Sequence, residues 1–271
     1  MKAVVIGGGT MGAGIAHLLL ANGHDVTLSE ADAERAEQGR AAVRRSLDKA
    51  REKGKLADAE AAFAKLSTGE LPADAELVVE AVPENVPLKQ EVLGFAAEKC
   101  PGAVLASNTS SLSIADIAAG LPGERVLGMH FFNPVPVQQL VELVHHEGVD
   151  PANVAKVRTW AEQMGKTVIE VRDSPGFATS RLGVAVGMEA IRMVEEGVAS
   201  AADIDTGMKL GYRWPMGPLE LTDLVGLDVR LAIAEHLAAR LGPRFEPPAL
   251  LRDKVARGEL GKKSGQGFFT W

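Results

Sequence analysis

Two ionisable side chains stand inside an otherwise apolar passage, GMHFFNPVPVQQLVELV, at residues 128–144. His130 and Glu142 are 12 positions apart, and strand-like residues flank both of them. Burial of such groups is costly unless they are paired. Pro134 and Pro136 can turn the chain between them, so we expect Glu142 to fold back onto the His130 imidazole. A carboxylate there fixes the tautomer and stabilises the protonated ring, which makes His130 a candidate acid/base near neutral pH.

Composition alone leaves a second interpretation of His130 open, because a lone buried histidine is more often a satisfied core residue. A glycine-rich turn decides between the two. Gly7, Gly9 and Gly12 form a GxGxxG pattern directly after the apolar run AVVI, and Thr10 and Met11 open the helix-like stretch that follows. In this context the pattern predicts a dinucleotide site, with phosphates at the helix N-terminus, rather than a flexible turn.

An acidic residue stands where a ribose contact is expected. Glu30 ends the second strand-like run, 18 residues past Gly12, and the next arginine is Arg35. An acid there accepts from the 2′-hydroxyl, so we predict NAD rather than NADP. With NAD bound nearby, His130 would take a hydroxyl proton while hydride leaves the same carbon for the nicotinamide.

Short apolar runs alternate with helical segments as far as about residue 171, which predicts a Rossmann-type α/β fold, a doubly wound and mostly parallel sheet. We predict strands at 3–6, 25–29, 77–80, 103–107, 125–130, 140–144 and 167–171. The segment RDSPG then breaks the pattern, and no strand is expected from Phe177 until the last few residues. We therefore predict an NAD-binding domain at 1–172 and an all-helical substrate and dimerisation domain at 173–271.

The carboxyl ends of parallel strands bind ligands in such folds. Besides His130, this rule selects Glu80 for the cofactor, and Ser110 in the polar cluster SNTSS at 107–111. Two plainer alternatives remain: Glu80 as a solvated loop acid, and the cluster as a helix N-cap.

The net charge of −7 argues against general nucleic-acid binding. A segment from Glu34 to Lys55 reverses the sign, with eight basic and four acidic residues. It is either a solvated helix with pairs such as Arg44 and Asp48, or a local anion site.

No apolar stretch suits a membrane span, and no signal peptide is expected before the first strand. The single cysteine, Cys100, suits a reducing cytoplasm. The histidines show no metal-ligand spacing, so no metal is predicted.

Several longer passages together resemble the 3-hydroxyacyl-CoA dehydrogenase family, and within it the short bacterial 3-hydroxybutyryl-CoA dehydrogenases. The resemblance covers nearly the whole chain, and HFFNPVP and PMGPLEL are far more specific than the glycine motif. The passages are GGGTMGAGIA (7–16), SNTSSLSI (107–114), HFFNPVPVQQLVE (130–142), DSPGF (173–177), PMGPLELTDLVGLD (215–228) and GKKSGQGF (261–268).

The resemblance implies roles for particular residues. His130 is the catalytic acid/base and Glu142 its partner; Ser110 contacts substrate and cofactor, Asn133 places the nicotinamide, and Lys263 approaches the cofactor. Ser46 and Lys53 contact CoA, which favours the anion-site interpretation of the basic segment, and dimers form through the helical domain. One position departs from the family pattern: Ser180 stands where an asparagine normally lies close to the reacting carbonyl. Serine is shorter and lacks the amide, which puts full activity or the usual substrate in doubt.

The expected function is the NAD-dependent oxidation of an L-3-hydroxyacyl-CoA, such as 3-hydroxybutyryl-CoA, to the 3-ketoacyl-CoA and the reverse, as in fatty-acid β-oxidation. Ser180 keeps open a CoA-independent hydroxy-acid or sugar-acid dehydrogenase, similar to L-gulonate dehydrogenase and lambda-crystallin. A non-catalytic NAD-binding module is the third alternative, which an unpaired His130 would favour.

Overall fold

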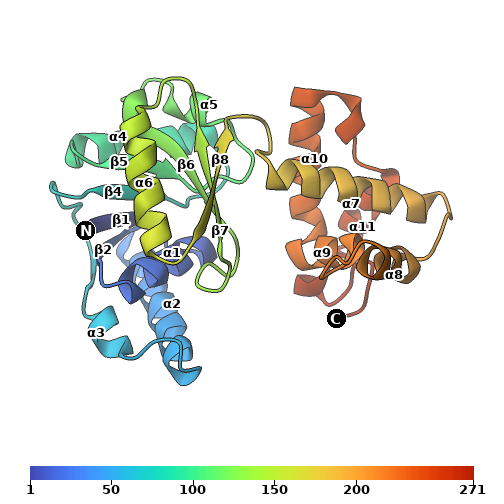
Figure 1. Cartoon of the computed structure of the whole chain (residues 1–271), viewed down its shortest axis with the longest axis horizontal. Coiled ribbons are helices and arrows are strands. Elements are labelled where there is room, and N and C mark those ends of the chain that lie inside the picture. The colour runs from blue at the N-terminus through green and yellow to red at the C-terminus, as the bar shows by residue number, and fades with distance from the viewer. The chain divides into compact units, whose positions relative to one another are not determined.

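The computed structural model describes residues 1–271, and the chain forms two compact units, Met1–Asp173 and Ser174–Trp271 (Figure 1). The first unit is built on one eight-stranded sheet in the order β3-β2-β1-β4-β5-β6-β7-β8. Its strands are β1 (Lys2–Ile6), β2 (Asp25–Ser29), β3 (Leu66–Thr68), β4 (Leu77–Glu80), β5 (Val104–Ser107), β6 (Val126–Phe131), β7 (Leu140–His145) and β8 (Thr167–Arg172).

Neighbouring strands run parallel from β3 across to β6, β7 is antiparallel to β6, and β8 is parallel to β7. The chain goes from β1 to β2 on one side and later returns to β4 on the other, so strand order reverses beside β1. Open sheets of this kind bind ligands at such a reversal point, at the carboxyl ends of the strands.

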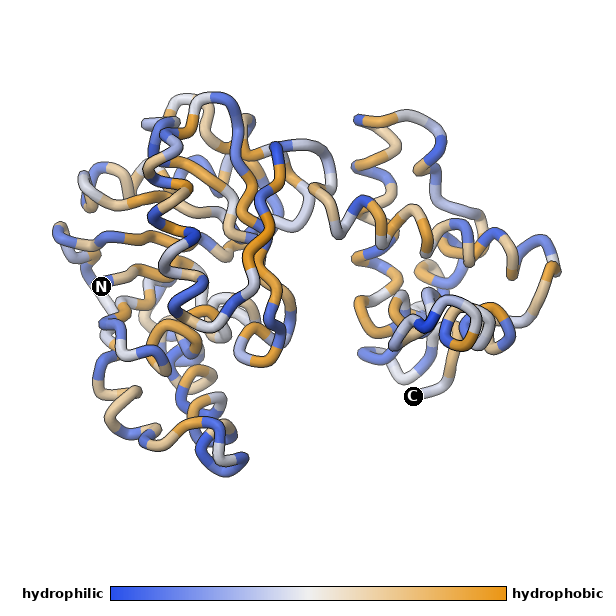
Figure 2. The backbone as a smooth tube through the Cα atoms, viewed as in Figure 1, coloured by the Kyte–Doolittle hydropathy of each residue, from blue (hydrophilic) through white to orange (hydrophobic).

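Helices cover both faces of the sheet, as the apolar strands require, and Figure 2 shows hydrophobic residues concentrated along those strands. One face packs with α1, α2 and α6, while α4 and α5 contact strands β4 to β6. The helices are α1 (Thr10–Ala21), α2 (Ala33–Glu52), α3 (Ala59–Phe63), α4 (Val86–Lys99), α5 (Ile114–Ala118) and α6 (Pro151–Gln163). Cys100 is buried at the end of α4.

The second unit is helical around its own apolar core. Its helices are α7 (Thr179–Glu195), α8 (Ala201–Gly211), α9 (Pro218–Val225), α10 (Leu227–Leu241) and α11 (Ala249–Ala256). Ser200 caps α8, because its side chain accepts from the Asp203 N–H.

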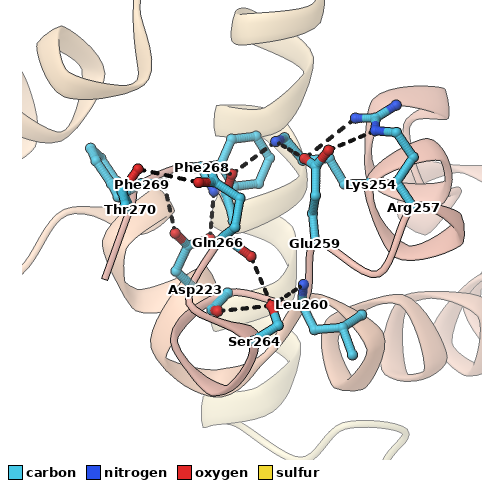
Figure 3. A network of polar contacts seen from close by, with 12 residues as sticks. Asp223, Lys254, Arg257, Glu259, Leu260, Ser264, Gln266, Phe268, Phe269 and Thr270 are labelled. Atoms are coloured by element: carbon cyan, nitrogen blue, oxygen red, sulfur yellow. Dashed lines mark hydrogen bonds and ion pairs between the residues drawn. The ribbon is translucent and has the colours of Figure 1, made fainter.

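The C-terminal glycine-rich segment is tied to α9 by one buried carboxylate (Figure 3). Asp223 accepts from the backbone N–H groups of Phe268 and Phe269, both at 2.8 Å, and from the indole Nε1 of Trp271 at 3.0 Å. A Cβ on Gly267 would lie 2.2 Å from Asp223 Oδ1, so only glycine permits this approach. The segment GKKSGQGF, which contains Lys263, therefore also holds the C-terminus of the chain against α9.

The α/β class, the mostly parallel sheet and the helical second part are confirmed. The seven predicted strands are present within one residue at each end, whereas β3 was not predicted. Strand β3 has three residues at the sheet edge, and two of them are exposed, so it leaves no apolar run in the sequence.

Candidate active site

The predicted acid/base pair forms across the antiparallel junction of the sheet. His130 on β6 lies directly opposite Glu142 on β7, and His130 Nδ1 is 2.7 Å from Glu142 Oε2. The Glu142 side chain is completely buried and that of His130 is 8% exposed. The Phe132 ring lies 4.5 Å from the imidazole, centroid to centroid, and restricts its surroundings further. The pairing fixes the ring orientation and directs the opposite nitrogen, Nε2, away from the carboxylate.

Asn108 connects this pair to the neighbouring strand. Its Oδ1 accepts from the backbone N–H of Phe131 at 2.9 Å, so the end of β5 is tied to the end of β6. The imidazole therefore lies on the same sheet edge as the residues that follow β1, β2, β4 and β5.

The glycine-rich turn has the geometry that a dinucleotide requires. Gly7 has a φ of 97°, and a Cβ on Gly12 would lie 1.7 Å from the Gly7 carbonyl oxygen, so neither position accepts a larger residue. No atom lies within 4 Å of a Cβ built on Gly9, and α1 begins there without a side-chain cap. The N–H groups of Thr10 and Met11 belong to the uncapped first turn of α1, where helix geometry provides no backbone acceptor, and this fits a pyrophosphate.

Glu30 stands beside this turn. Its Oε1 accepts from the Gly8 N–H at 2.5 Å. A Cβ on Gly8 would lie 3.0 Å from the Gly39 Cα, so α2 also packs tightly against the turn. Arg35 pairs with Asp32, at 3.5 Å, rather than extending toward Glu30. A carboxylate with no neighbouring guanidinium therefore stands beside the glycine-rich turn, as a contact to a ribose 2′-hydroxyl would require.

Glu80 is not a solvated loop acid, because its side chain is completely buried. Its Oε1 accepts from Lys89 Nζ at 2.8 Å and from the Val82 N–H at 2.6 Å, and its Oε2 accepts from Ser107 Oγ at 2.7 Å. Burial raises the pKa of Glu80, and the Lys89 charge opposes that shift. A direct cofactor contact by Glu80 stays a prediction; in the structure it orients Lys89 and Ser107.

Ser110 is held by a residue that the sequence did not single out. Glu84 Oε1 accepts from both the Ser110 N–H at 2.7 Å and its hydroxyl at 3.0 Å, and Glu84 Oε2 lies 3.5 Å from Lys89 Nζ. Glu80, Lys89, Glu84 and Ser110 form one polar chain along the carboxyl edge of β4 and β5. A sequence signal existed: a buried strand-end acid needs a counter-charge, and Lys89 follows nine residues later, in the first turn of α4.

Ser46, a predicted CoA contact, has a histidine behind it. His17 on α1 lies 2.6 Å from Ser46 Oγ through Nδ1, and burial lowers the pKa of His17 to about 4. The imidazole is therefore neutral at physiological pH and holds the hydroxyl in one orientation.

The basic segment forms α2 and the turn after it. Arg44 pairs with Asp48 and Glu60, as the solvated-helix interpretation expected for the first of these pairs. Other cations have no carboxylate partner and remain available to an anion; they are Arg45, Lys49, Arg51, Lys53 and Lys55.

Three predicted site residues, Asn133, Ser180 and Lys263, lie outside the contacts described so far. Asn133 is exposed in the turn between β6 and β7. Ser180 occupies the second position of α7 and is half-buried, and Lys263 pairs with Asp228, both in the second unit. No group of three or more potential ligands could hold a metal ion, and none of the helices has the length and apolar character to cross a membrane.

The glycine turn, the Glu30 carboxylate beside it and the His130–Glu142 pair lie on one sheet edge, an arrangement that is typical of a nucleotide-dependent dehydrogenase. Two family models match the chain: the NAD-binding domain of 3-hydroxyacyl-CoA dehydrogenase over residues 2–174, and the C-terminal domain of 3-hydroxyacyl-CoA dehydrogenase over 176–271. The chain belongs to the 3-hydroxyacyl-CoA dehydrogenase family.

Individual proteins that are similar to this chain over its whole length support the same family. A probable 3-hydroxybutyryl-CoA dehydrogenase of Deinococcus radiodurans is 43% identical over 281 residues, covering 100% of both chains. The crystal structure of Mycobacterium tuberculosis FadB2 is 40% identical with a TM-score of 0.94, covering 99% of this chain and 98% of that one. The (S)-3-hydroxybutyryl-CoA dehydrogenase of Ralstonia eutropha is 38% identical with a TM-score of 0.93, covering 100% and 98%.

Proposed function

We propose that this protein interconverts short-chain L-3-hydroxyacyl-CoA and 3-ketoacyl-CoA, with His130 and Glu142 as its acid/base pair. The reaction class, NAD-dependent dehydrogenation of a 3-hydroxyacyl-CoA, follows from family membership over both parts of the chain. The short acyl chain is supported by the 3-hydroxybutyryl-CoA dehydrogenases among its relatives. The single observation that carries the mechanism is the 2.7 Å contact between His130 and Glu142.

The roles of the residues follow from their placement. When bound, the nicotinamide exchanges a hydride with C3 of the acyl chain. His130 Nε2 exchanges a proton with the C3 oxygen, while Glu142 keeps Nδ1 protonated and stabilises the imidazolium that forms. The Ser110 hydroxyl, oriented by Glu84, lies on the same edge and is assigned to the substrate and the cofactor.

The cofactor is NAD(H), and we propose that NAD is preferred over NADP. Glu30 supports this preference, since a 2′-phosphate near its carboxylate would meet repulsion and no cation. We assign the pyrophosphate to the turn that ends at the N–H groups of Thr10 and Met11.

The CoA moiety is assigned to α2. The Ser46 hydroxyl and the unpaired cations that include Lys53 provide donors and positive charge for its phosphates. We assign Ser180 to the region of the reacting carbonyl and Lys263 to the cofactor.

We also propose a homodimer through the second unit. Most of the exposed large apolar side chains belong to that unit: Leu182, Val198, Leu210, Tyr212, Leu224, Val225, Val229 and Trp271. Light scattering on the purified protein should give twice the mass of 28.6 kDa, and the monomer mass would contradict the proposal.

The function is tested with purified protein and NADH by following cofactor oxidation at 340 nm. Acetoacetyl-CoA should be reduced rapidly, whereas free acetoacetate and NADPH should react far more slowly. Turnover of acetoacetate alone would favour the CoA-independent alternative, and Ser180 would be the first residue to exchange for asparagine. Binding of NADH without turnover of either substrate would favour a non-catalytic module.

A further inference from the structure

Arg230 on α10 is a buried arginine without a partner. Its side chain makes no ion pair or hydrogen bond, its residue is 5% exposed, and its Nε is enclosed with no acceptor. Burial alone lowers the pKa of Arg230 to about 10, with no neighbouring carboxylate to oppose it. An arginine stays charged even so, and an uncompensated buried charge is among the costliest features that a fold can carry.

The guanidinium lies against α7. A Cβ on Gly183 would be 3.1 Å from Arg230 Nη1 and 3.7 Å from Nη2, so the glycine provides the space that the guanidinium occupies. Gly176, just before α7, is in the same way next to Leu237. From Gly176 to Gly183 the chain advances seven residues, whereas the residues of α10 that they contact go back seven, from Leu237 to Arg230. The two helices therefore pack antiparallel.

This packing brings the guanidinium close to Ser180. Ser180 precedes Gly183 by three residues, so the two lie on the same side of α7, about 4.5 Å apart along the helix axis. Ser180 is the residue that we assign to the region of the reacting carbonyl. An unpaired guanidinium within about one helical turn of Ser180 has the right chemistry for a carboxylate, which it binds through two parallel hydrogen bonds.

We propose that Arg230 determines substrate specificity by binding a carboxylate at the far end of the acyl chain, so that the preferred substrate is the CoA thioester of a 3-hydroxy dicarboxylic acid. This inference rests on the proposed function. A neutral carbonyl offsets only part of the burial cost of a cation, whereas a carboxylate neutralises it. A six-carbon chain places its terminal carboxylate three bonds beyond C3, a span comparable to the one helical turn that separates Ser180 from Gly183.

The test uses a matched pair of substrates that differ only in the terminal carboxylate: 3-oxoadipyl-CoA and 3-oxohexanoyl-CoA, followed by NADH oxidation. The wild-type protein should show a kcat/KM at least about 10-fold higher for the dicarboxylic thioester. Arg230→Met should abolish or reverse that ratio while it leaves turnover of 3-oxohexanoyl-CoA within about threefold of wild type. Arg230→Lys should retain part of the preference, because lysine keeps the charge but loses the bidentate geometry.

A second readout separates a binding role from a structural one. Removal of an uncompensated buried charge should stabilise the fold, so Arg230→Met should raise the Tm of the second unit by about 5 °C. A lower Tm with an unchanged substrate ratio would make Arg230 structural and overturn the proposal. Equal losses on both thioesters would also overturn it, because Arg230 would then bind a group common to both, such as a CoA phosphate.

The inference and the proposed function fail in different ways. NADH oxidation by 3-oxohexanoyl-CoA with no preference for the carboxylate overturns the inference and leaves the function in place. No oxidation by either thioester overturns both. A matched pair two carbons longer, 3-oxosuberyl-CoA and 3-oxooctanoyl-CoA, checks the length, and a preference at eight carbons but not at six would overturn the proposed six-carbon fit.

Discussion

Lys89 and Glu80 form a buried ion pair at the carboxyl end of β4. The structure gives the loss of stability that is expected when this pair is broken. Lys89 is 1% exposed, Glu80 is completely buried, and their charged atoms lie 2.8 Å apart. Lys89→Met removes one partner and leaves a carboxylate in a dry site. Breaking such a pair costs about 3–5 kcal/mol, a large share of the roughly 5–15 kcal/mol that a domain has in total.

The loss should depend on pH in a defined direction. Burial raises the pKa of Glu80 above 4.5, and Lys89 restrains that rise, so the variant should raise this pKa further. An acid whose pKa is raised by folding contributes stability that is fully present below its unfolded pKa and is lost as pH rises through the folded pKa. Lys89→Met should therefore lose less stability at pH 5 than at pH 8, because protonation of Glu80 becomes more favourable as the pH falls.

The assay is urea unfolding at both pH values. Trp160, the only tryptophan of the first unit, reports on that unit in a Trp214→Phe/Trp271→Phe background. The matched control is Glu80→Gln/Lys89→Met, which removes both charges and should recover most of the stability. A loss of less than about 1 kcal/mol at pH 8, or an equal loss in the single and double variants, would refute the reasoning.

Three further predictions follow from other contacts. Glu142→Gln should lower kcat about 10²–10³-fold, because a carboxylate beside an imidazolium contributes about 4 kcal/mol at an effective dielectric constant of 20; an unchanged kcat would contradict the assigned pair. His17→Leu should raise the KM for acetoacetyl-CoA about fivefold without changing the KM for NADH, and the effect should disappear in a Ser46→Ala background; a matching rise in the NADH KM would count against it. Asp223→Ala should lower the free energy of unfolding by about 3 kcal/mol or more in a urea melt, since three donors lose their acceptor; an unchanged midpoint would show that other contacts hold the C-terminal segment.

The parts of the fold that were predictable have local causes. Apolar runs such as LVVE mark strands covered on both faces, and β4 is buried along its whole length. The pairing of His130 with Glu142 was predictable because two prolines limit how the intervening chain can run. Strand β3 was not, since it owes its place to pairing with β2 rather than to its own residues.

The residues missed in the site are those whose partners are distant in sequence or whose burial is unexpected. Lys89 stands in a polar stretch, LKQE, that is typical of an exposed helix face, yet α4 directs it under the sheet edge to Glu80. His17 is 29 residues from Ser46, and only the packing of α1 on α2 brings the two together. The sequence contains no indication that Arg230 is unusual, because neither its burial nor its lack of a hydrogen-bond partner can be read from the neighbouring residues.

The most direct test of the central claim is the kcat of His130→Gln with acetoacetyl-CoA and NADH, measured together with the dissociation constant for NADH. We expect kcat to fall about 10²–10⁴-fold while the dissociation constant stays within about twofold of wild type, because His130 exchanges the proton but does not bind the cofactor. A near-normal kcat with intact NADH binding would show that His130 is not the acid/base of this enzyme.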